Sequence, residues 1–178
     1  MILLVDQDGC ISDIENGFLS KWKEIYPDEF YVPVKQRTTH MIIDQYPLAL
    51  RQKVKSIYHA PGFFLELKPM AGAVEALREM ASLNLDVRIC TSPLYHYQNC
   101  LVEKYKWVEL YFGLEYTKKI ILTQDKTIVR GNYLIDDSPY ISGICLPEWE
   151  HILFDAPYNR GGDLKRLTWT NWKQVLSF

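Results

Sequence analysis

Short apolar runs recur along the chain, and each ends in a polar or glycine-containing turn. The four clearest are residues 2–5, 85–90, 133–135 and 151–154, and a weaker fifth spans residues 119–122. Runs of this length that are apolar on both faces are typical of strands in a parallel sheet, because helices cover both sides of such strands. The pattern therefore predicts a buried parallel sheet.

Apolar residues at helical spacing separate these runs. The first stripe has four members, Ile14, Phe18, Trp22 and Ile25. Ser12, followed three residues later by Glu15, has the signature of a capping box and predicts that this helix starts there. Further helices are predicted over residues 69–84, 95–106 and 168–178. Strands that alternate with helices indicate an α/β fold, a Rossmann-like parallel sheet flanked by helices.

One long span does not fit the alternation. Residues 16–68 contain the first helix, a loop rich in proline and threonine, and a second helix with Leu50, Val54 and Ile57 on one face. This span lies between the first two predicted strands. We therefore expect a small helical cap at 16–68, inserted into a core made of residues 1–15 and 69–178.

Composition excludes several classes of function. The 178 residues carry a net charge of −2, which gives no electrostatic basis for binding a polynucleotide. The four cysteines form no pair at zinc spacing and are interpreted as reduced thiols. Met1 leads directly into an apolar strand without the pattern of a signal peptide, and no stretch is long enough to span a bilayer. A cytoplasmic protein is predicted.

Acidic pairs follow two of the predicted strands. Asp6 and Asp8 follow the first, and Asp136 and Asp137 follow the run at 133–135. Either pair alone could be only a cap or a turn, but the carboxyl ends of parallel strands meet at one edge of a sheet. Clustered carboxylates repel one another unless a cation intervenes, and Mg²⁺ prefers oxygen ligands. No histidine or cysteine accompanies these residues in the sequence, which argues against zinc.

Other residues at the strand ends suit a phosphate group. Thr91 and Ser92 follow the second strand, where hydroxyls and backbone amides can hold anionic oxygens. Lys126 follows the weaker strand and could neutralise phosphoryl charge, although the alternative of an ordinary surface lysine is open. Asp6 could then attack phosphorus as a nucleophile, with Asp8 as the acid and base.

In this order the segments VDQDG, ICTSP, DKT and LIDDSP resemble the four motifs of the haloacid dehalogenase (HAD) superfamily of phosphohydrolases. The segments GAVEALREMASL, EKYKWVELYFG and WEHILF extend the likeness, and the chain is similar nearly throughout to the 5′(3′)-deoxyribonucleotidases. This resemblance implies a HAD-like core with a helical cap, Mg²⁺ dependence and hydrolysis of deoxyribonucleoside monophosphates. It also implies a possible homodimer.

The resemblance also implies roles for individual residues. It places Mg²⁺ on Asp6, on the backbone carbonyl of Asp8 and on Asp136, with Asp137 in support. It places phosphate on Thr91, Ser92 and Lys126, and it puts Lys104 near the active site. Substrate contacts are implied at seven positions, Ile14, His40, Met41, Ile42, Phe64, Lys104 and Gln124.

Several of these positions depart from the family pattern. Aromatic residues are usual at the cap positions held by His40 and Met41, phenylalanine is frequent at Ile14, and arginine is usual at Gln124. For His40 and Met41, packing between cap and core is an equal alternative. Two other functions stay open: a HAD phosphatase for another small phosphomonoester, and a catalytically idle nucleotide-binding protein.

Overall fold

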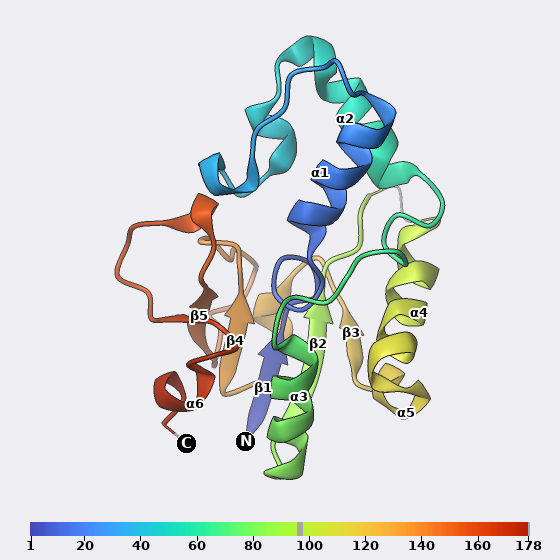
Figure 1. The fold of residues 1–178 in the computed structure, drawn as a ribbon. Coiled ribbons are helices and arrows are strands. Elements are labelled where there is room, and N and C mark those ends of the chain that lie inside the picture. Colours follow the sequence, from blue (N-terminus) through green and yellow to red (C-terminus); the bar gives the residue numbers. More distant parts are fainter. Residues whose placement is uncertain (96–97, 178) are drawn as a thin grey trace.

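A six-stranded parallel sheet forms the centre of the computed structural model, which describes residues 1–95 and 98–177 (Figure 1). Its order is β3-β2-β1-β4-β5-β6. The strands are β1 (Ile2–Val5), β2 (Asp86–Thr91), β3 (Ile120–Leu122), β4 (Tyr133–Asp136), β5 (Glu150–Phe154) and β6 (Arg166–Leu167). The five predicted strands and the α/β class are confirmed. The two-residue β6 was not predicted, because it is too short to show an apolar run.

The central position of β1 determines where the chemistry lies. In register, Val5 of β1 pairs with Ile89 of β2 on one side and with Ile135 of β4 on the other. From β1 the chain continues to β2 on one side of the sheet, and from β4 it continues to β5 on the other side. The connections therefore diverge between β1 and β4, and the crevice at such a point is the usual ligand site of parallel sheets. The residues that follow β1, β2 and β4 meet there.

Four helices accompany the sheet: α3 (Ala73–Ser82), α4 (Cys100–Phe112), α5 (Leu114–Thr117) and α6 (Trp172–Val175). Figure 1 shows α3 lying across one face of the sheet, with α4 and α5 to the side of β3. The helix predicted over 95–106 begins later, at Cys100, and residues 96–97 of that prediction lie outside the described part of the chain. The helix predicted from residue 69 begins at Ala73.

Helices α1 (Ile14–Ile25) and α2 (Arg51–His59) lie beyond the carboxyl ends of the strands (Figure 1). Three 3₁₀ turns, Val34–Gln36, Ile42–Gln45 and Leu48–Leu50, connect them. Aromatic side chains join the two helices, since Phe18 of α1 stacks on Tyr58 of α2 with ring centroids 5.3 Å apart. The division into a core and a cap at residues 16–68 stays a prediction.

Two predictions about α1 are wrong. Asp13, rather than Ser12, caps the helix, because its carboxylate accepts a hydrogen bond from the backbone N–H of Asn16 at 3.1 Å. Ser12 instead points its hydroxyl toward the strand ends. Ile25 is 50% exposed and does not continue the apolar stripe of Phe18 and Trp22. No helix among the described residues has the length and hydropathy to cross a bilayer.

Candidate active site

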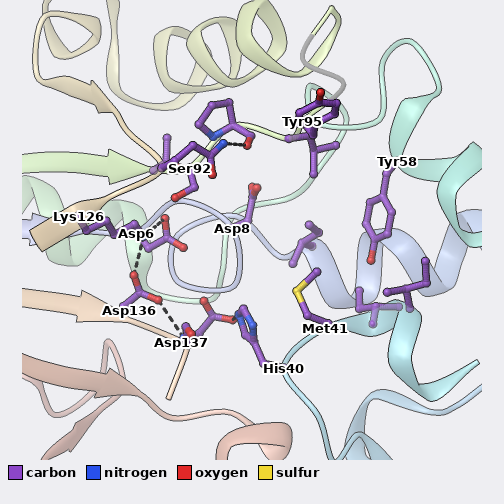
Figure 2. A pocket seen from close by; sticks show the side chains of 18 of the residues that line it. Asp6, Asp8, His40, Met41, Tyr58, Ser92, Tyr95, Lys126, Asp136 and Asp137 are labelled. Atoms are coloured by element: carbon purple, nitrogen blue, oxygen red, sulfur yellow. Dashed lines mark hydrogen bonds and ion pairs between the residues drawn. The ribbon is translucent and has the colours of Figure 1, made fainter. Parts of the chain in front are cut away.

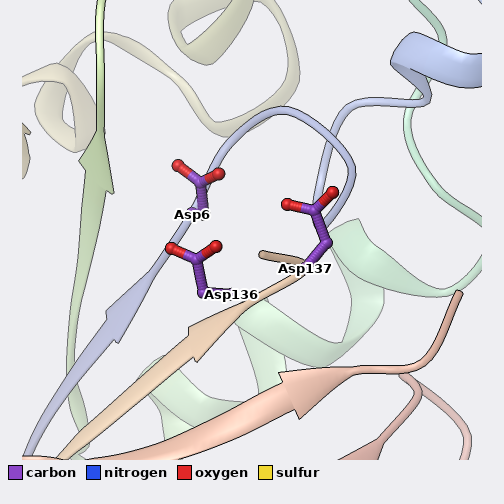
Figure 3. A group of neighbouring side chains, drawn as sticks. All are labelled: Asp6, Asp136 and Asp137. Carbon is purple, nitrogen blue, oxygen red and sulfur yellow. The ribbon is translucent and has the colours of Figure 1, made fainter. Parts of the chain in front are cut away.

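Strand register brings three carboxylates together. Asp6 directly follows β1, Asp136 ends the neighbouring β4, and the backbone N–H of Asp6 donates to the carbonyl of Ile135 at 2.9 Å. One oxygen from each of Asp6, Asp136 and Asp137 lies within 4.8 Å of the others. Figure 3 shows the three side chains converging at the edge of the sheet. The convergence that the sequence predicted is therefore present.

Lys126 lies between two of these carboxylates. Its Nζ is 2.8 Å from Asp6 Oδ1 and 2.5 Å from Asp136 Oδ2, and the residue is only 6% exposed. Burial opposes the charge, but the carboxylates of Asp6 and Asp136 raise the pKa of Lys126 above its ordinary value. The lysine is therefore a fixed buried cation, and the alternative of an ordinary surface lysine is excluded.

The cluster still carries more negative than positive charge. Burial, and then the charge of Asp6, raise the pKa of Asp136 although Lys126 lowers it. A carboxylate whose pKa rises beside a lysine is one that the available positive charge does not fully balance. The ligand atoms are all carboxylate oxygens, which suit a hard divalent cation. The residues present therefore fit such an ion.

Asp8 lies outside this group and is held by its own partners. Ser12 Oγ donates to Asp8 Oδ1 at 2.8 Å, and Lys104 Nζ donates to Asp8 Oδ2 at 2.6 Å. Lys104 also donates to Thr91 Oγ1 at 2.7 Å and is only 1% exposed. Both oxygens of Asp8 are thus fixed, and the hydroxyl proton of Thr91 stays available to a ligand.

Gly9 allows the turn after Asp8 to fold back on the cluster. Its φ is +83°, a conformation that side chains disfavour. A Cβ atom at this position would lie 2.4 Å from Asp137 Oδ2. The glycine is therefore required by its conformation and by the space that Asp137 occupies.

A histidine from outside the acidic motifs reaches the carboxylates in the folded chain. His40 Nε2 lies 3.4 Å from Asp137 Oδ2, and Tyr158 donates its hydroxyl to the same oxygen at 2.5 Å. Burial opposes protonation of His40, but the hydrogen bond that its ring N–H donates to Asp137 raises its pKa. His40 comes from a loop distant in sequence from every acidic pair, and no spacing could have revealed the contact. Among the described residues, the group that could hold a metal ion still consists of carboxylates alone.

The loop that carries His40 is tied to α1 by Arg37. The Arg37 guanidinium donates to Glu15 Oε2 at 2.5 Å and to the carbonyls of Thr39 and His40, both at 3.1 Å. Burial raises the pKa of Glu15 to about 7, although the charge of Arg37 opposes the rise. Arg37 therefore holds the loop in place over the strand ends.

A cavity of about 760 Å³ extends from the carboxylates to α2 (Figure 2). Every residue that the sequence assigned to the site lines it except Lys104, which reaches it through Asp8 and Thr91. The assigned residues in the lining are Asp6, Asp8, Ile14, His40, Met41, Ile42, Phe64, Thr91, Ser92, Gln124, Lys126, Asp136 and Asp137. Gln124 donates its side-chain N–H to the carbonyl of Pro93 at 2.6 Å.

Other residues in the lining were not predicted. Glu15, Tyr58 and Tyr140 are among them. Tyr58 lies in α2 next to the apolar face of that helix. From the sequence alone, such a residue cannot be distinguished from one that only packs in the core. Glu15 was read as part of a cap.

Comparison with known proteins gives one consistent result. The family model described as "5′ nucleotidase, deoxy (Pyrimidine), cytosolic type C protein" matches residues 1–177. A protein of Bordetella bronchiseptica, named provisionally as a 5′(3′)-deoxyribonucleotidase, is 48% identical over 178 residues, which cover 99% of this chain and 96% of that protein. The human cytosolic-type 5′(3′)-deoxyribonucleotidase is 44% identical over 185 residues, covering 98% and 92%.

A solved structure matches the fold. It is a HAD family hydrolase of Deinococcus radiodurans with bound phosphate and sodium, and it superposes with a TM-score of 0.57 at 13% identity. The match covers 99% of this chain and 94% of that one. At this identity the likeness supports the HAD fold.

Proposed function

The chain belongs to the family of 5′ nucleotidases, deoxy (pyrimidine), cytosolic type C, and is a phosphomonoester hydrolase; from this premise we propose its substrate and mechanism. It is a magnesium-dependent phosphatase that hydrolyses deoxyribonucleoside 5′-monophosphates, and also nucleoside 3′- or 2′-monophosphates, through an aspartyl-phosphate intermediate. The observation that carries this proposal is that Asp6, Asp8, Thr91 and Lys126 surround one end of the cavity, where the phosphate would lie.

The first step transfers the phosphoryl group to Asp6. Its carboxylate oxygen attacks phosphorus while the bond from phosphorus to the sugar oxygen breaks, and Asp8 gives that oxygen a proton. Lys126 holds Asp6 in place at 2.8 Å and contributes positive charge beside the phosphoryl oxygens. The hydroxyls of Thr91 and Ser92 donate to the same oxygens.

The second step frees the enzyme. Asp8 takes a proton from a water molecule, whose oxygen attacks phosphorus and breaks the bond to Asp6. Inorganic phosphate leaves, and both aspartates return to their starting states. Ser12 and Lys104 keep the Asp8 carboxylate pointed at the same place through both steps.

Asp6, Asp136 and Asp137 would hold Mg²⁺, with Asp8 contributing its backbone carbonyl as the resemblance implies. When bound, the ion supplies the positive charge that lets an anionic phosphate approach several carboxylates. The homodimer that the resemblance implies and the cytoplasmic location that the composition predicts stay predictions.

The apolar half of the cavity supports a nucleoside as the rest of the substrate. Ile14, Met41, Ile42 and Phe64 line it. Such a wall suits the flat face of a base better than the hydroxyls of a sugar phosphate. A catalytically idle binding protein would not need Asp8, with both of its carboxylate oxygens held in place, beside Asp6.

Release of inorganic phosphate tests the proposal. The substrates are 5′- and 3′-monophosphates of each nucleoside, in deoxy and ribo forms, beside simple sugar phosphates, each with Mg²⁺ or with EDTA. We expect the fastest release from thymine and uracil deoxyribonucleotides, and none in EDTA. Release only from non-nucleotide substrates would overturn the substrate assignment, and no release from any substrate would favour an idle binder.

A further inference from the structure

Helix α4 holds the segment that leads from α2 back to the core, which we call the return segment (residues 59–67). Asn99, Glu103 and Trp107 are four residues apart and therefore lie on one side of the helix. All three form hydrogen bonds with the backbone of the return segment. Asn99 and Trp107 donate to the carbonyls of its first and last residues, at 3.2 Å and 2.7 Å. The segment is therefore attached to α4 at both ends.

Glu103 makes the attachment in the middle of the return segment. Its Oε1 accepts a hydrogen bond from the backbone N–H of Gly62 at 2.7 Å, and its Oε2 accepts one from the N–H of Phe64 at 3.1 Å. Glu103 is only 8% exposed. Hydrogen bonds to a charged group are stronger than those between neutral groups, and they are costly to lose when they are buried. Glu103 therefore fixes the backbone position of Phe64.

The ring of Phe64 lies against the lysine that holds Asp8. Lys104 Nζ is 5.5 Å from the centroid of this ring, within the range of a cation–π interaction. Phe64 lines the cavity and Lys104 does not, and both residues are buried. The ring is therefore part of the cover that keeps water away from the ammonium group. Exclusion of water strengthens the ion pair in which Lys104 Nζ lies 2.6 Å from Asp8 Oδ2.

We propose that Glu103 is a positioning residue for the reaction, which keeps Asp8 oriented by holding Phe64 over Lys104. Glu103 does not line the cavity, so it acts only through these neighbours. This role rests on the proposed function, because it takes Asp8 to be the group that gives a proton to the leaving oxygen. If the backbone of Phe64 shifts, water reaches Lys104, the ion pair with Asp8 weakens, and the proton is delivered more slowly.

The test isolates proton delivery by changing the leaving atom. Thymidine 5′-monophosphate is compared with the analogue in which sulfur replaces the oxygen between phosphorus and the sugar. The oxygen needs a proton as its bond to phosphorus breaks, whereas a thiolate leaves without one. The measured rate is the release of thymidine or 5′-thiothymidine in a single turnover, so the later hydrolysis of the aspartyl-phosphate does not affect it.

Four variants are compared with the wild type, each at a temperature where thermal unfolding shows it to be folded. Asp8→Asn removes the proton donor and is the reference. Glu103→Gln keeps the size of the side chain but offers one accepting oxygen to two backbone N–H groups. Phe64→Leu removes the aromatic cover and tests the same chain of contacts even if Glu103→Gln does not fold. Glu109→Gln, the same substitution at an exposed position of α4, is the control.

In Glu103→Gln we expect the rate for the oxygen ester to fall about 10- to 100-fold relative to the rate for the sulfur ester, the size of effect that a displaced catalytic group produces. Phe64→Leu should change this ratio in the same direction, and Glu109→Gln should keep the wild-type ratio. A merely structural role would lower both rates equally, because unfolded molecules cleave neither ester. Contacts with the phosphate, such as that of Thr91, affect both esters alike and cancel in the ratio.

The outcomes that contradict these ideas differ from one another. If Asp8→Asn lowers the ratio but folded Glu103→Gln keeps the wild-type value, the inference about Glu103 is wrong and the proposed function stands. An unchanged ratio in Phe64→Leu would overturn the inference in the same way. If the wild type cleaves neither ester, the proposed function itself fails, and if Asp8→Asn keeps the wild-type ratio, the proposed role of Asp8 as proton donor fails.

Discussion

The two ends of the cavity are built in opposite ways. At the end formed by the strands, every acidic side chain has a charged or hydrogen-bonded partner, such as Lys126 for Asp6 and Lys104 for Asp8. At the end formed by α1, α2 and the connecting loop, the wall is largely apolar, and Met41 is 55% exposed. One end is held together by ion pairs and hydrogen bonds, and the other presents a mostly apolar wall to the cavity.

The contrast shows where chemistry and selection are separated in this molecule. A reaction centre needs fixed distances, which buried strand ends and ion pairs supply. Selection needs a surface that distinguishes ligands, and apolar walls with few polar groups can change without disturbing that centre. Changes at the strand end should therefore affect rate and folding, and changes at the other end should affect mainly affinity.

Asp6→Asn should give the largest effect. The amide retains the shape but loses the nucleophile, so kcat should fall on the order of 10⁴-fold or more. Phosphate release gives the rate, and thermal unfolding should show that the fold persists. Asp163→Asn, at an exposed carboxylate, is the control and should retain the wild-type rate. A normal rate in Asp6→Asn would remove this residue from the role of nucleophile.

Lys126→Met should lower both activity and stability at the strand end. Removing one partner of a buried ion pair leaves unbalanced charge and lowers the free energy of unfolding by about 3 to 5 kcal/mol. Denaturant unfolding in EDTA measures this loss, and Mg²⁺ should restore more stability to the variant than to the wild type. Lys118→Met, at a lysine whose side chain is 70% exposed, should change stability by less than about 0.5 kcal/mol. Equal stability of Lys126→Met and the wild type in EDTA would contradict the prediction.

Glu15→Gln should give the smallest effect and act through pH. The pKa of Glu15 rises from 4.5 to about 7 on folding, so the folded state binds this proton more tightly than the unfolded state. This contribution to stability is complete below pH 4.5 and is lost as pH rises toward 7. Glutamine cannot ionise but can still accept from Arg37.

The measurement is the free energy of unfolding from pH 4.5 to 8 in wild type and variant. The wild type should lose about 2 to 3 kcal/mol relative to Glu15→Gln over this range. Glu24→Gln, on the same helix but exposed, is the control and should follow the wild type. Parallel curves for the wild type and Glu15→Gln would show that Arg37 keeps Glu15 ionised throughout.

Much of the fold could be predicted because strands buried on both faces have a continuous apolar signature. The five predicted strands are all present, and their parallel order explains why acidic pairs far apart in sequence meet. Helix boundaries were less predictable. Ser12 has the residue type of a helix cap, but its hydroxyl forms a hydrogen bond with Asp8 instead, and local pattern does not reveal such tertiary competition.

The residues of the candidate site also differ in how far the sequence could predict their positions. Asp6, Asp8 and Asp136 follow strands, so the topology alone brings them to one edge. His40, Tyr58 and Tyr158 come from loops and from a helix that crosses over that edge, and their approach depends on packing between distant segments. Lys104 lies within α4, and nothing in the local sequence distinguishes it from the other residues of that helix. Only the resemblance to a family indicated that it lies near the active site.

The turn at Gly9 also constrains how this sequence can change over generations. The space that a side chain would need there is already filled by the carboxylate of Asp137, 2.4 Å from the position of the missing Cβ. A mutation at residue 9 is therefore blocked as a single step, and a smaller residue at position 137 would remove only the steric part of the block, because the φ of +83° would still disfavour a side chain. Because Asp137 belongs to the carboxylate cluster, a chain with that smaller residue would also be impaired, and the two positions, far apart in the gene, are expected to stay fixed together.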